Sequence, residues 1–424
     1  MSHNIATADP ERIAPEITVG RLPAAEVPMS ILFSVFQTGR MANGGVESVT
    51  AIIKDLKECE RIVVTNLESP FCERWRKAGA RVIVWDLGYE IGASFAGATL
   101  REKLARIVGL VKTNLDVFRW LRSQSISLIH CNDPAPFWHV ALAARAARIP
   151  LLLNLRDTKT PAEGLNAGKY RRRFRWSTRV LVLSKEMKRF YERVFAGMPI
   201  RKSPQIVYGY SAVDLSRFHP VEAPVRRELR SRLRIEPGQF ALGFIATFND
   251  KKNQLGFLRS AIPLLAQRCP QAHTYFVGDF DPQRDAYALE CERLTEQLQL
   301  KPYVTFQNYT AQIQDWYRAC DVIVVPTRKE GLARCMIEAL ACGTPVVSFD
   351  VASAHEILSE HGCGRVVSQG DYVGFCSNLI ELAESSELRN EYGTQGAALA
   401  RRCFSNETCL NTYRALTHEL VTRR

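Results

Sequence analysis

The sequence lacks the features that mark membrane-spanning and secreted proteins. No apolar run among its 424 residues approaches the ~20 residues that a helix needs to cross a bilayer. The N-terminus also lacks the basic segment followed by an apolar segment that makes a signal peptide. We therefore expect a protein that stays in the cytoplasm.

The cysteines and histidines lack the spacing of disulfide and metal sites. Twelve cysteines are scattered from Cys59 to Cys409 without a C-x-x-C pair, and no histidines cluster at metal-ligand intervals. Thiols of a cytosolic protein explain these cysteines better than disulfides do. The net charge of +12, by contrast, is an excess that favours phosphate-rich partners, which include nucleotide sugars, an anionic membrane face and nucleic acid.

Short apolar runs alternate with helical patterns in both halves of the chain. In the first half the expected strands are 31–36, 62–64, 82–85, 126–129, 151–155 and 180–183, with helices at 46–56 and 100–122. In the second half the expected strands are 241–246, 273–277, 303–306, 322–325 and 346–349. This alternation predicts an α/β fold with parallel sheets covered on both faces, and we expect the helix at 100–122 to pack. The length predicts two domains after a flexible leader at 1–28. The charged stretch 221–238 fits a boundary between them, so we expect domains at 29–222 and 223–405.

The most informative stretch is 321–349. A buried strand is followed by a polar loop and then by a helix that Gly343 and Pro345 bring to an end. Open α/β sheets bind ligands in such loops, and the helix N-terminus favours anions. Glu330 lies in this loop and Glu338 in the helix, on different helix faces, so we expect two separate hydrogen-bonding roles on one extended ligand. An exposed loop glutamate and a solvated helical glutamate are the alternative.

This stretch resembles the family-four (group 1) retaining glycosyltransferases. The residues that match the family pattern at fixed spacing are Glu330, Gly331, Glu338, Ala339, Ala341, Gly343, Pro345, Val346 and Val347. The resemblance implies that Glu330 contacts the donor sugar and that Glu338 contacts the nucleotide ribose. It also implies that the backbone of Gly331, Leu332 and Ala333 helps to hold the sugar and the diphosphate.

Two further strand-end loops resemble the family. Gly44 and Gly45 match its Gly-Gly-x-Glu, where glycine lets the backbone approach the donor closely. In the loop after 241–246, Lys252 aligns with a lysine that neutralises the donor diphosphate, but Thr247 stands where relatives carry arginine. Either another cation substitutes or donor affinity is reduced. The candidate substitutes are Lys251, Arg328 and Arg334.

Two single residues complete the predicted site. Gly278 resembles a strand-ending glycine of the family and is expected to let the backbone approach the nucleotide. Asp157 follows the strand at 151–155, where relatives often place a polar group near the donor sugar, although a capping role is equally open. We predict catalytic roles for Glu330, Lys252 and Asp157.

The segment 169–179 combines six basic residues with three aromatic residues. This composition suits an anionic lipid surface and, less well, nucleic acid. The alternative is a solvated helix face with its aromatic side chains turned inward. The residues predicted to contact a membrane or the acceptor are Arg171, Arg172, Arg173, Arg175 and Trp176.

The resemblance also implies an architecture and an activity. The architecture is GT-B, with two facing Rossmann-like domains around a cleft, the donor held mainly by the second domain, and a final helix at 406–424 that crosses back to the first. The activity is transfer of a sugar from a nucleotide diphosphate sugar to a glycan or lipid-linked acceptor, with retention, in cell-surface polysaccharide or glycoconjugate synthesis. We identify no Asp-x-Asp metal site and expect no metal or other cofactor. A nucleotide-sugar 2-epimerase of the same fold and a non-catalytic basic binding protein are the alternatives.

Overall fold

The computed structural model describes residues 29–37, 44–85, 99–158, 174–197 and 204–422, which fall into two compact domains. The first domain runs to Gly209 and includes the chain again from Leu410, and the second runs from Tyr210 to Cys409. This boundary lies earlier than 222, where the sequence placed it. The reason is that the segment after Tyr210 packs with the second domain, where Val213 pairs with Ser405 in a parallel β-bridge.

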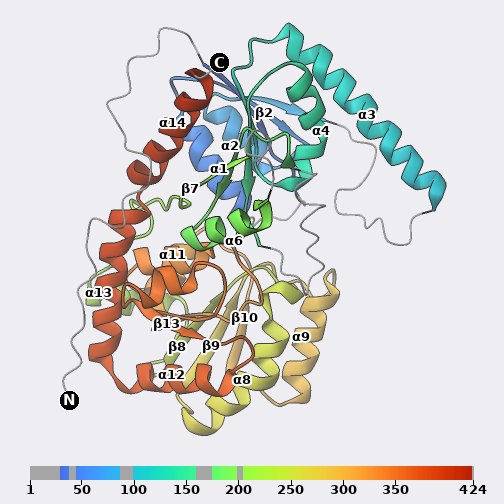
Figure 1. Ribbon diagram of the computed structural model, residues 1–424. Coiled ribbons are helices and arrows are strands. Elements are labelled where there is room, and N and C mark those ends of the chain that lie inside the picture. The colour runs from blue at the N-terminus through green and yellow to red at the C-terminus, as the bar shows by residue number, and fades with distance from the viewer. Residues whose placement is uncertain (1–28, 38–43, 86–98, 159–173, 198–203, 423–424) are drawn as a thin grey trace. The chain divides into compact units, whose positions relative to one another are not determined.

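The first domain is built on a seven-stranded parallel sheet with the order β3-β2-β1-β4-β5-β6-β7 (Figure 1). Its strands are β1 (Ser30–Ser34), β2 (Glu60–Thr65), β3 (Arg81–Val84), β4 (Leu128–Cys131), β5 (Leu151–Leu155), β6 (Arg179–Val182) and β7 (Gln205–Tyr208). Its described helices are α1 (Gly44–Asp55), α2 (Pro70–Lys77), α3 (Leu100–Ser123), α4 (Pro134–Ala146), α6 (Lys185–Phe195) and most of α14 (Asn406–Thr422).

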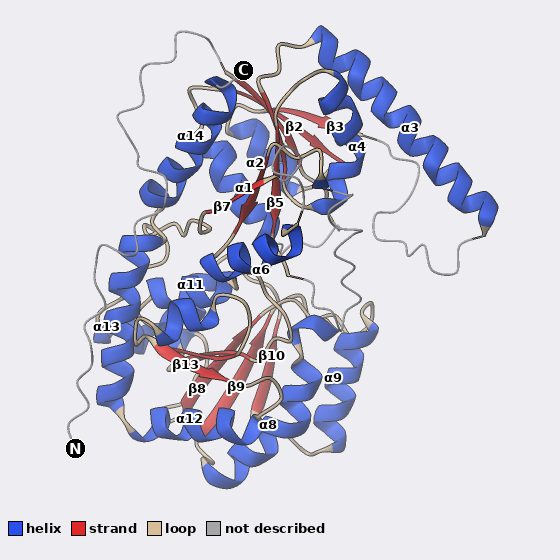
Figure 2. Ribbon diagram, in the orientation of Figure 1, coloured by secondary structure: helices blue, strands red, loops and turns tan. Residues whose placement is uncertain are grey.

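The second domain repeats this plan with a six-stranded parallel sheet, in the order β10-β9-β8-β11-β12-β13 (Figure 2). Its strands are β8 (Phe240–Ile245), β9 (Ala272–Val277), β10 (Val304–Gln307), β11 (Val322–Val325), β12 (Val346–Phe349) and β13 (Gly364–Val367). Its α-helices are α7 (Ala223–Arg232), α8 (Gln254–Arg268), α9 (Ala286–Gln297), α10 (Ile313–Ala319), α11 (Arg334–Ala341), α12 (Tyr372–Glu384) and α13 (Ser386–Cys403). In both sheets the first and fourth strands are neighbours, and at this switch point open α/β sheets bind ligands beyond the carboxyl ends of the strands.

Helix α14 completes the core of the first domain. Its Tyr413, Leu416 and Leu420 are at most 5% exposed and join the core cluster on one face of the sheet. The Tyr413 hydroxyl lies 2.5 Å from Nδ1 of His130, a fully buried residue of β4. Burial, and then the charge of Arg156, lower the pKa of His130 to about 3, so its imidazole is neutral at pH 7. His130 therefore belongs to the strand and the core, whereas the strand expected at 126–129 ended one residue before it.

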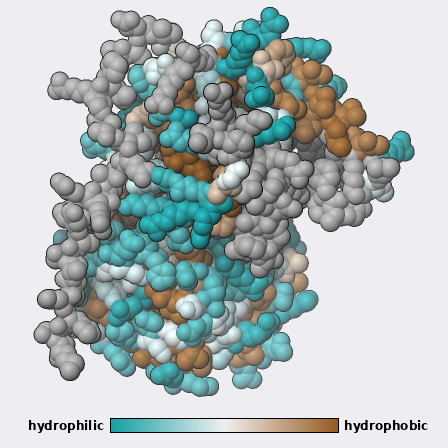
Figure 3. Space-filling view, viewed as in Figure 1, coloured by the Kyte–Doolittle hydropathy of each residue, from teal (hydrophilic) through white to brown (hydrophobic). Residues whose placement is uncertain are grey.

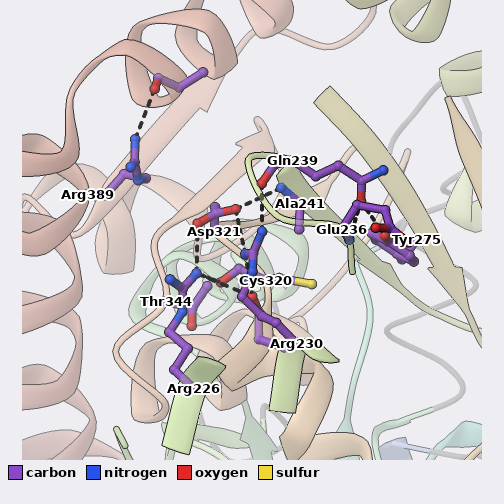
Figure 4. A network of polar contacts seen from close by, with 12 residues as sticks. Arg226, Arg230, Glu236, Gln239, Ala241, Tyr275, Cys320, Asp321, Thr344 and Arg389 are labelled. Atoms are coloured by element: carbon purple, nitrogen blue, oxygen red, sulfur yellow. Dashed lines mark hydrogen bonds and ion pairs between the residues drawn. The ribbon is translucent and has the colours of Figure 1, made fainter. Parts of the chain in front are cut away.

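A charged network fixes the start of the second sheet (Figure 4). Asp321, just before β11, accepts hydrogen bonds from Arg226 at 2.7 Å, from Arg230 at 3.0 Å and from the backbone N–H of Ala241 at 2.8 Å. Burial alone would raise the pKa of Asp321, but Arg226 and Arg230 outweigh it, and the net pKa is lowered. One carboxylate thus ties α7 to β8 and β11.

None of the described helices is long and apolar enough to cross a membrane. The longest, α3, nevertheless presents apolar side chains on its outer surface, where Figure 3 shows a band of hydrophobic atoms. We expected this helix to pack, and it does so against α4, but only along one face.

Candidate active site

Two loops meet at the switch point of the second domain, one after β8 and one after β11. The backbone carbonyl of Lys251 accepts from the N–H of Arg328 at 3.0 Å and from the hydroxyl of Thr327 at 2.8 Å. Asn253 adds a third link, because its side-chain amide donates to the carbonyl of Pro326 at 2.9 Å. The loops are therefore held together by backbone-directed hydrogen bonds, and their side chains have fixed positions.

A lysine pair faces one carboxylate at this point. The 3₁₀ turn Asp250–Lys252 presents Lys252, whose ammonium donates to Oε1 of Glu330, and Lys251, whose Nζ lies 3.8 Å from Oε2. Glu330 is only 8% exposed, and a carboxylate so buried requires cationic partners. Two positive charges against one negative charge leave the cluster with a net positive charge, which suits an anionic ligand.

Glu338 lies in a second cluster, with different partners. Arg334 donates to its Oε1 from Nε at 3.0 Å and from Nη2 at 2.8 Å, and the hydroxyl of Tyr317 donates to Oε2 at 2.9 Å. Burial, and then the neighbouring Glu338 carboxylate, raise the pKa of Tyr317 well above its usual value, so it stays a protonated donor. The N-cap of α11, Ala333, makes no side-chain capping hydrogen bond to the first amides of the helix.

The three cations proposed to compensate for Thr247 each have a carboxylate partner. Arg328 makes two hydrogen bonds with Asp250, at 2.7 and 2.8 Å, and Arg334 is engaged by Glu338. Lys251 shares the Glu330 carboxylate with Lys252, and which of the three cations compensates for Thr247 stays a prediction. Thr247 itself has a structural role, because its hydroxyl accepts from Asn249 at 3.0 Å.

Gly278 is required by the backbone around it. A Cβ at this position would lie 2.0 Å from the carbonyl oxygen of Ala246, which no real contact allows. The close approach follows from the pairing of β8 with β9, because the N–H of Ala246 donates to the carbonyl of Val277 at 3.0 Å. This contact explains the glycine without a ligand, and its predicted role toward a nucleotide stays a prediction.

In the first domain, Gly44 and Gly45 open α1. The side-chain amide of Asn132, which follows β4, donates to the carbonyl of Gly45 at 3.2 Å. Strands β1 and β4 are neighbours at the switch point of this sheet, so the two glycines lie at the edge where ligands bind.

Asp157 lies at the same edge, beyond the end of β5. Its backbone carbonyl accepts from the hydroxyl of Tyr191 at 2.5 Å, and the preceding Arg156 donates to the hydroxyl of Ser48 in α1 at 2.9 Å. Asp133, which follows β4, is the N-cap of α4 and accepts from the N–H of Ala135. Asp157 is thus placed where the sequence expected it, and its catalytic role stays a prediction.

The basic segment is described only in its second part, because Arg171, Arg172 and Arg173 lie outside the described residues. The guanidinium of Arg175 lies 4.8 Å from the centre of the Trp176 ring. The ring centres of Trp176 and Trp138, a residue of α4, are 6.5 Å apart. Phe174 is buried at 1% exposure. At least one aromatic side chain of the segment is therefore turned inward, as the alternative interpretation required.

Sequence reasoning passed over two features of the second domain. Tyr317, a partner of Glu338, belongs to α10, and no local pattern marks it. Asp279 and Asp281, after β9, do have the Asp-x-Asp spacing that we did not identify. Asp281 accepts from the N–H of Gln283 at 3.2 Å, and in the described part of the chain no three His, Cys, Asp or Glu side chains converge as they would around a metal ion.

Comparison with protein-family models gives two matches. Residues 43–202 match the glycosyl transferase 4-like domain, and residues 239–385 match the glycosyl transferases group 1 model. Together the matches cover more than half of the chain. The chain belongs to the group 1 glycosyltransferases.

Curated relatives from this family match part of the chain. D-inositol 3-phosphate glycosyltransferase 2 of Catenulispora acidiphila is 30% identical over 195 residues, which are 45% of this chain and 45% of that protein. The lipopolysaccharide core biosynthesis mannosyltransferase LpsB of Rhizobium meliloti is 29% identical over 147 residues, 35% of this chain and 41% of that protein. The chain spans about half the length of the curated relatives it matches.

Solved glycosyltransferase structures match nearly the whole chain. Alr3699/HepE of Anabaena, solved in complex with UDP and glucose, has a TM-score of 0.74 at 21% identity, over 92% of this chain and 99% of that chain. Sucrose-phosphate synthase of Thermosynechococcus elongatus has a TM-score of 0.72 at 18% identity, over 93% of this chain and 100% of that chain. These similarities confirm the predicted α/β, two-domain GT-B fold.

Proposed function

We propose that this group 1 family member transfers a sugar from a nucleotide diphosphate sugar to a glycan or lipid-linked acceptor, with retention at the anomeric carbon and without a metal ion. The observation that carries the proposal is the cluster of Lys251, Lys252 and Glu330 at the switch point of the second domain. It combines a net positive charge for a diphosphate with a carboxylate for sugar hydroxyls, at the sheet edge where α/β proteins bind nucleotides.

Lys252 is the residue that would stabilise the leaving group. An ammonium carries three N–H donors, so Lys252 can hold Glu330 and donate to a diphosphate oxygen together. Negative charge grows on that oxygen as the bond to the anomeric carbon breaks, and a cation fixed in a mostly buried site stabilises this charge strongly. Lys251 would supply the second cation that Thr247 does not.

Glu330 and Glu338 would orient the two ends of the donor. Glu330 would accept hydrogen bonds from sugar hydroxyls while its charge keeps Lys252 in place. Glu338 would accept from ribose hydroxyls, held by Arg334 and Tyr317. Because the two glutamates have different partners, we infer two roles on one extended ligand and not a carboxylate pair that shares a proton.

The proposed transfer needs no nucleophilic side chain of the protein. The bond from the anomeric carbon to the diphosphate oxygen breaks, and an acceptor hydroxyl oxygen forms the new bond on the same face of the sugar. The hydroxyl proton passes to the departing diphosphate oxygen. Asp157, at the ligand-binding edge of the first sheet, would orient the reacting groups.

The names of the matched proteins support the substrate classes. Alr3699/HepE was also solved with UDP-glucose, and LpsB is named for lipopolysaccharide core biosynthesis. For this chain we propose a nucleotide diphosphate sugar as the donor. We also propose a role in polysaccharide or glycoconjugate synthesis at the cytoplasmic face of the membrane.

A panel of nucleotide sugars tests the proposal. A donor that binds only the folded protein raises its melting temperature, and the full donor should do so more than the nucleoside diphosphate alone. Incubation with the stabilising donor and a cell-envelope lipid extract should release nucleoside diphosphate and label the lipid. An epimerised sugar formed without acceptor would instead identify a 2-epimerase. No stabilisation by any nucleotide sugar would favour a non-catalytic binding protein.

A further inference from the structure

Helix α3 of the first domain carries an apolar stripe that the fold leaves exposed. Its members are Leu104, Ile107, Val108, Val111 and Leu115, which are 54, 54, 65, 47 and 51% exposed. Their spacing of three, four, seven and eleven positions from the first member puts them on one face of the helix. Figure 3 shows the corresponding band of hydrophobic atoms along α3.

The inner face of α3 fixes the direction of this stripe. Val117 and Leu121 are buried at 3 and 2% exposure. Asn114, at 4%, donates to the carbonyl of Trp138 at 2.9 Å and accepts from the N–H of Ala143 at 3.2 Å, both in α4. Because these hydrogen bonds set the rotation of α3, the stripe cannot turn inward without breaking them.

Basic side chains border the stripe on one side. At 100° per residue, Arg101, Lys112 and Arg119 lie about 60–80° round the helix from Leu104. Among the α3 side chains that the structure describes, the one acidic side chain is Asp116, and it pairs with Arg119 at 3.2 Å. An apolar face bordered by lysine and arginine is typical of helices that lie in a membrane interface.

We propose that the α3 stripe docks the first domain onto an anionic lipid surface. The apolar side chains enter the boundary between headgroups and acyl chains, while Arg101, Lys112 and Arg119 contact lipid phosphates. The charge argues against a second copy of the chain as the occupant, because two such faces would bring like charges together. The proposal rests on the lipid-linked acceptor of the proposed function, but it does not depend on donor chemistry.

Vesicle flotation with a matched pair of variants tests the stripe. The wild type should float with phosphatidylcholine vesicles that contain phosphatidylglycerol, and far less with phosphatidylcholine alone. Val108→Glu should reduce partitioning at least ~tenfold, because it replaces an inserted apolar side chain by a charge that the lipid repels. Val373→Glu is the control, since Val373 lies in the second domain and is 60% exposed, against 65% for Val108. It should float like the wild type.

A fluorescent probe gives an independent readout. All twelve native cysteines are buried or half-buried, so a cysteine at an exposed position can be labelled selectively. An environment-sensitive dye on Val108→Cys should brighten and shift to the blue with anionic vesicles, and the same dye on Val373→Cys should not.

Three results would overturn the proposal: no flotation of the wild type, equal flotation of Val108→Glu and the wild type, or a wild-type dimer that Val108→Glu dissociates without any vesicle binding. The last would assign the stripe to a second copy. Since none of these measurements uses a donor, the transferase assignment would stand or fall separately.

Discussion

Removing Lys252 and Glu330 singly and together measures whether they act as one unit. In Lys252→Ala, the Glu330 side chain, 10% exposed, keeps Lys251 as its neighbouring cation, 3.8 Å away. Breaking a fully buried ion pair costs about 3–5 kcal/mol. Because Lys251 remains and Lys252 is itself 21% exposed, we expect a smaller loss, about 2 kcal/mol, in the local stability of β8 and β11. Glu330→Gln keeps the shape and a hydrogen-bond acceptor, so it should cost about 1 kcal/mol.

The double variant should lose less than the sum of the two single losses, with a coupling energy of about 1 kcal/mol. Hydrogen exchange of the β8 and β11 amides, followed by mass spectrometry, measures these losses locally. Donor turnover should fall at least ~tenfold in each single variant. The loss in the double variant should be smaller than the product of the two single losses, since the effects of residues that act as a unit are not additive.

A surface pair of the same domain provides the control. Lys301 and Glu296 are 2.8 Å apart but 70 and 56% exposed, so the same substitutions there should show no measurable coupling and leave turnover unchanged. Additive losses and multiplied turnover defects at Lys252 and Glu330 would refute the reasoning.

The remaining predictions concern the frame of the second domain and metal ions. Gly278→Ala should destabilise this domain by at least about 2 kcal/mol, because its Cβ meets the carbonyl of Ala246 at 2.0 Å; a melting temperature equal to wild type would contradict this. Asp321→Asn should lower stability at pH 7, measured by urea unfolding. Since the pKa of Asp321 is lowered on folding, its contribution is present above its unfolded pKa of about 3.9 and disappears as the pH falls through the folded value, so the two proteins should converge in acid. Transfer should proceed equally with and without EDTA, and loss of turnover restored by Mg²⁺ or Mn²⁺ would show a metal requirement.

The sequence predicted the parts of the fold that local patterns determine. Eleven apolar runs correspond to strands, but the two edge strands β7 and β13 were missed. Both are four-residue strands with short apolar runs, 206–208 and 366–367, which give a weak local signal. Exposure of α3 was missed for a related reason, because a helical pattern does not tell which of two apolar faces finds a partner.

The candidate site divides in the same way. Glu330 and Glu338 stand in one continuous motif, so their loop and helix positions were predictable from spacing. Lys252 and Glu330 are 78 positions apart, and their pairing depends on β8 and β11 being neighbours in the sheet. The order of strands in a sheet cannot be read from a local motif. The carboxylate partners of Lys251, Arg328 and Arg334 likewise depend on the fold and could not be read from a motif.

The path of α14 has a consequence for how the protein folds during synthesis. The core of the first domain needs Tyr413, Leu416 and Leu420, which the ribosome makes only after the entire second domain. Until then the buried His130 lacks its hydroxyl partner, and the face of the first sheet that α1, α2 and α14 share is only partly covered. The second domain, continuous from Tyr210 to Cys409, can complete its own core before the first. Completion of the first-domain core is therefore coupled to the synthesis of α14, and until then its apolar surface stays exposed.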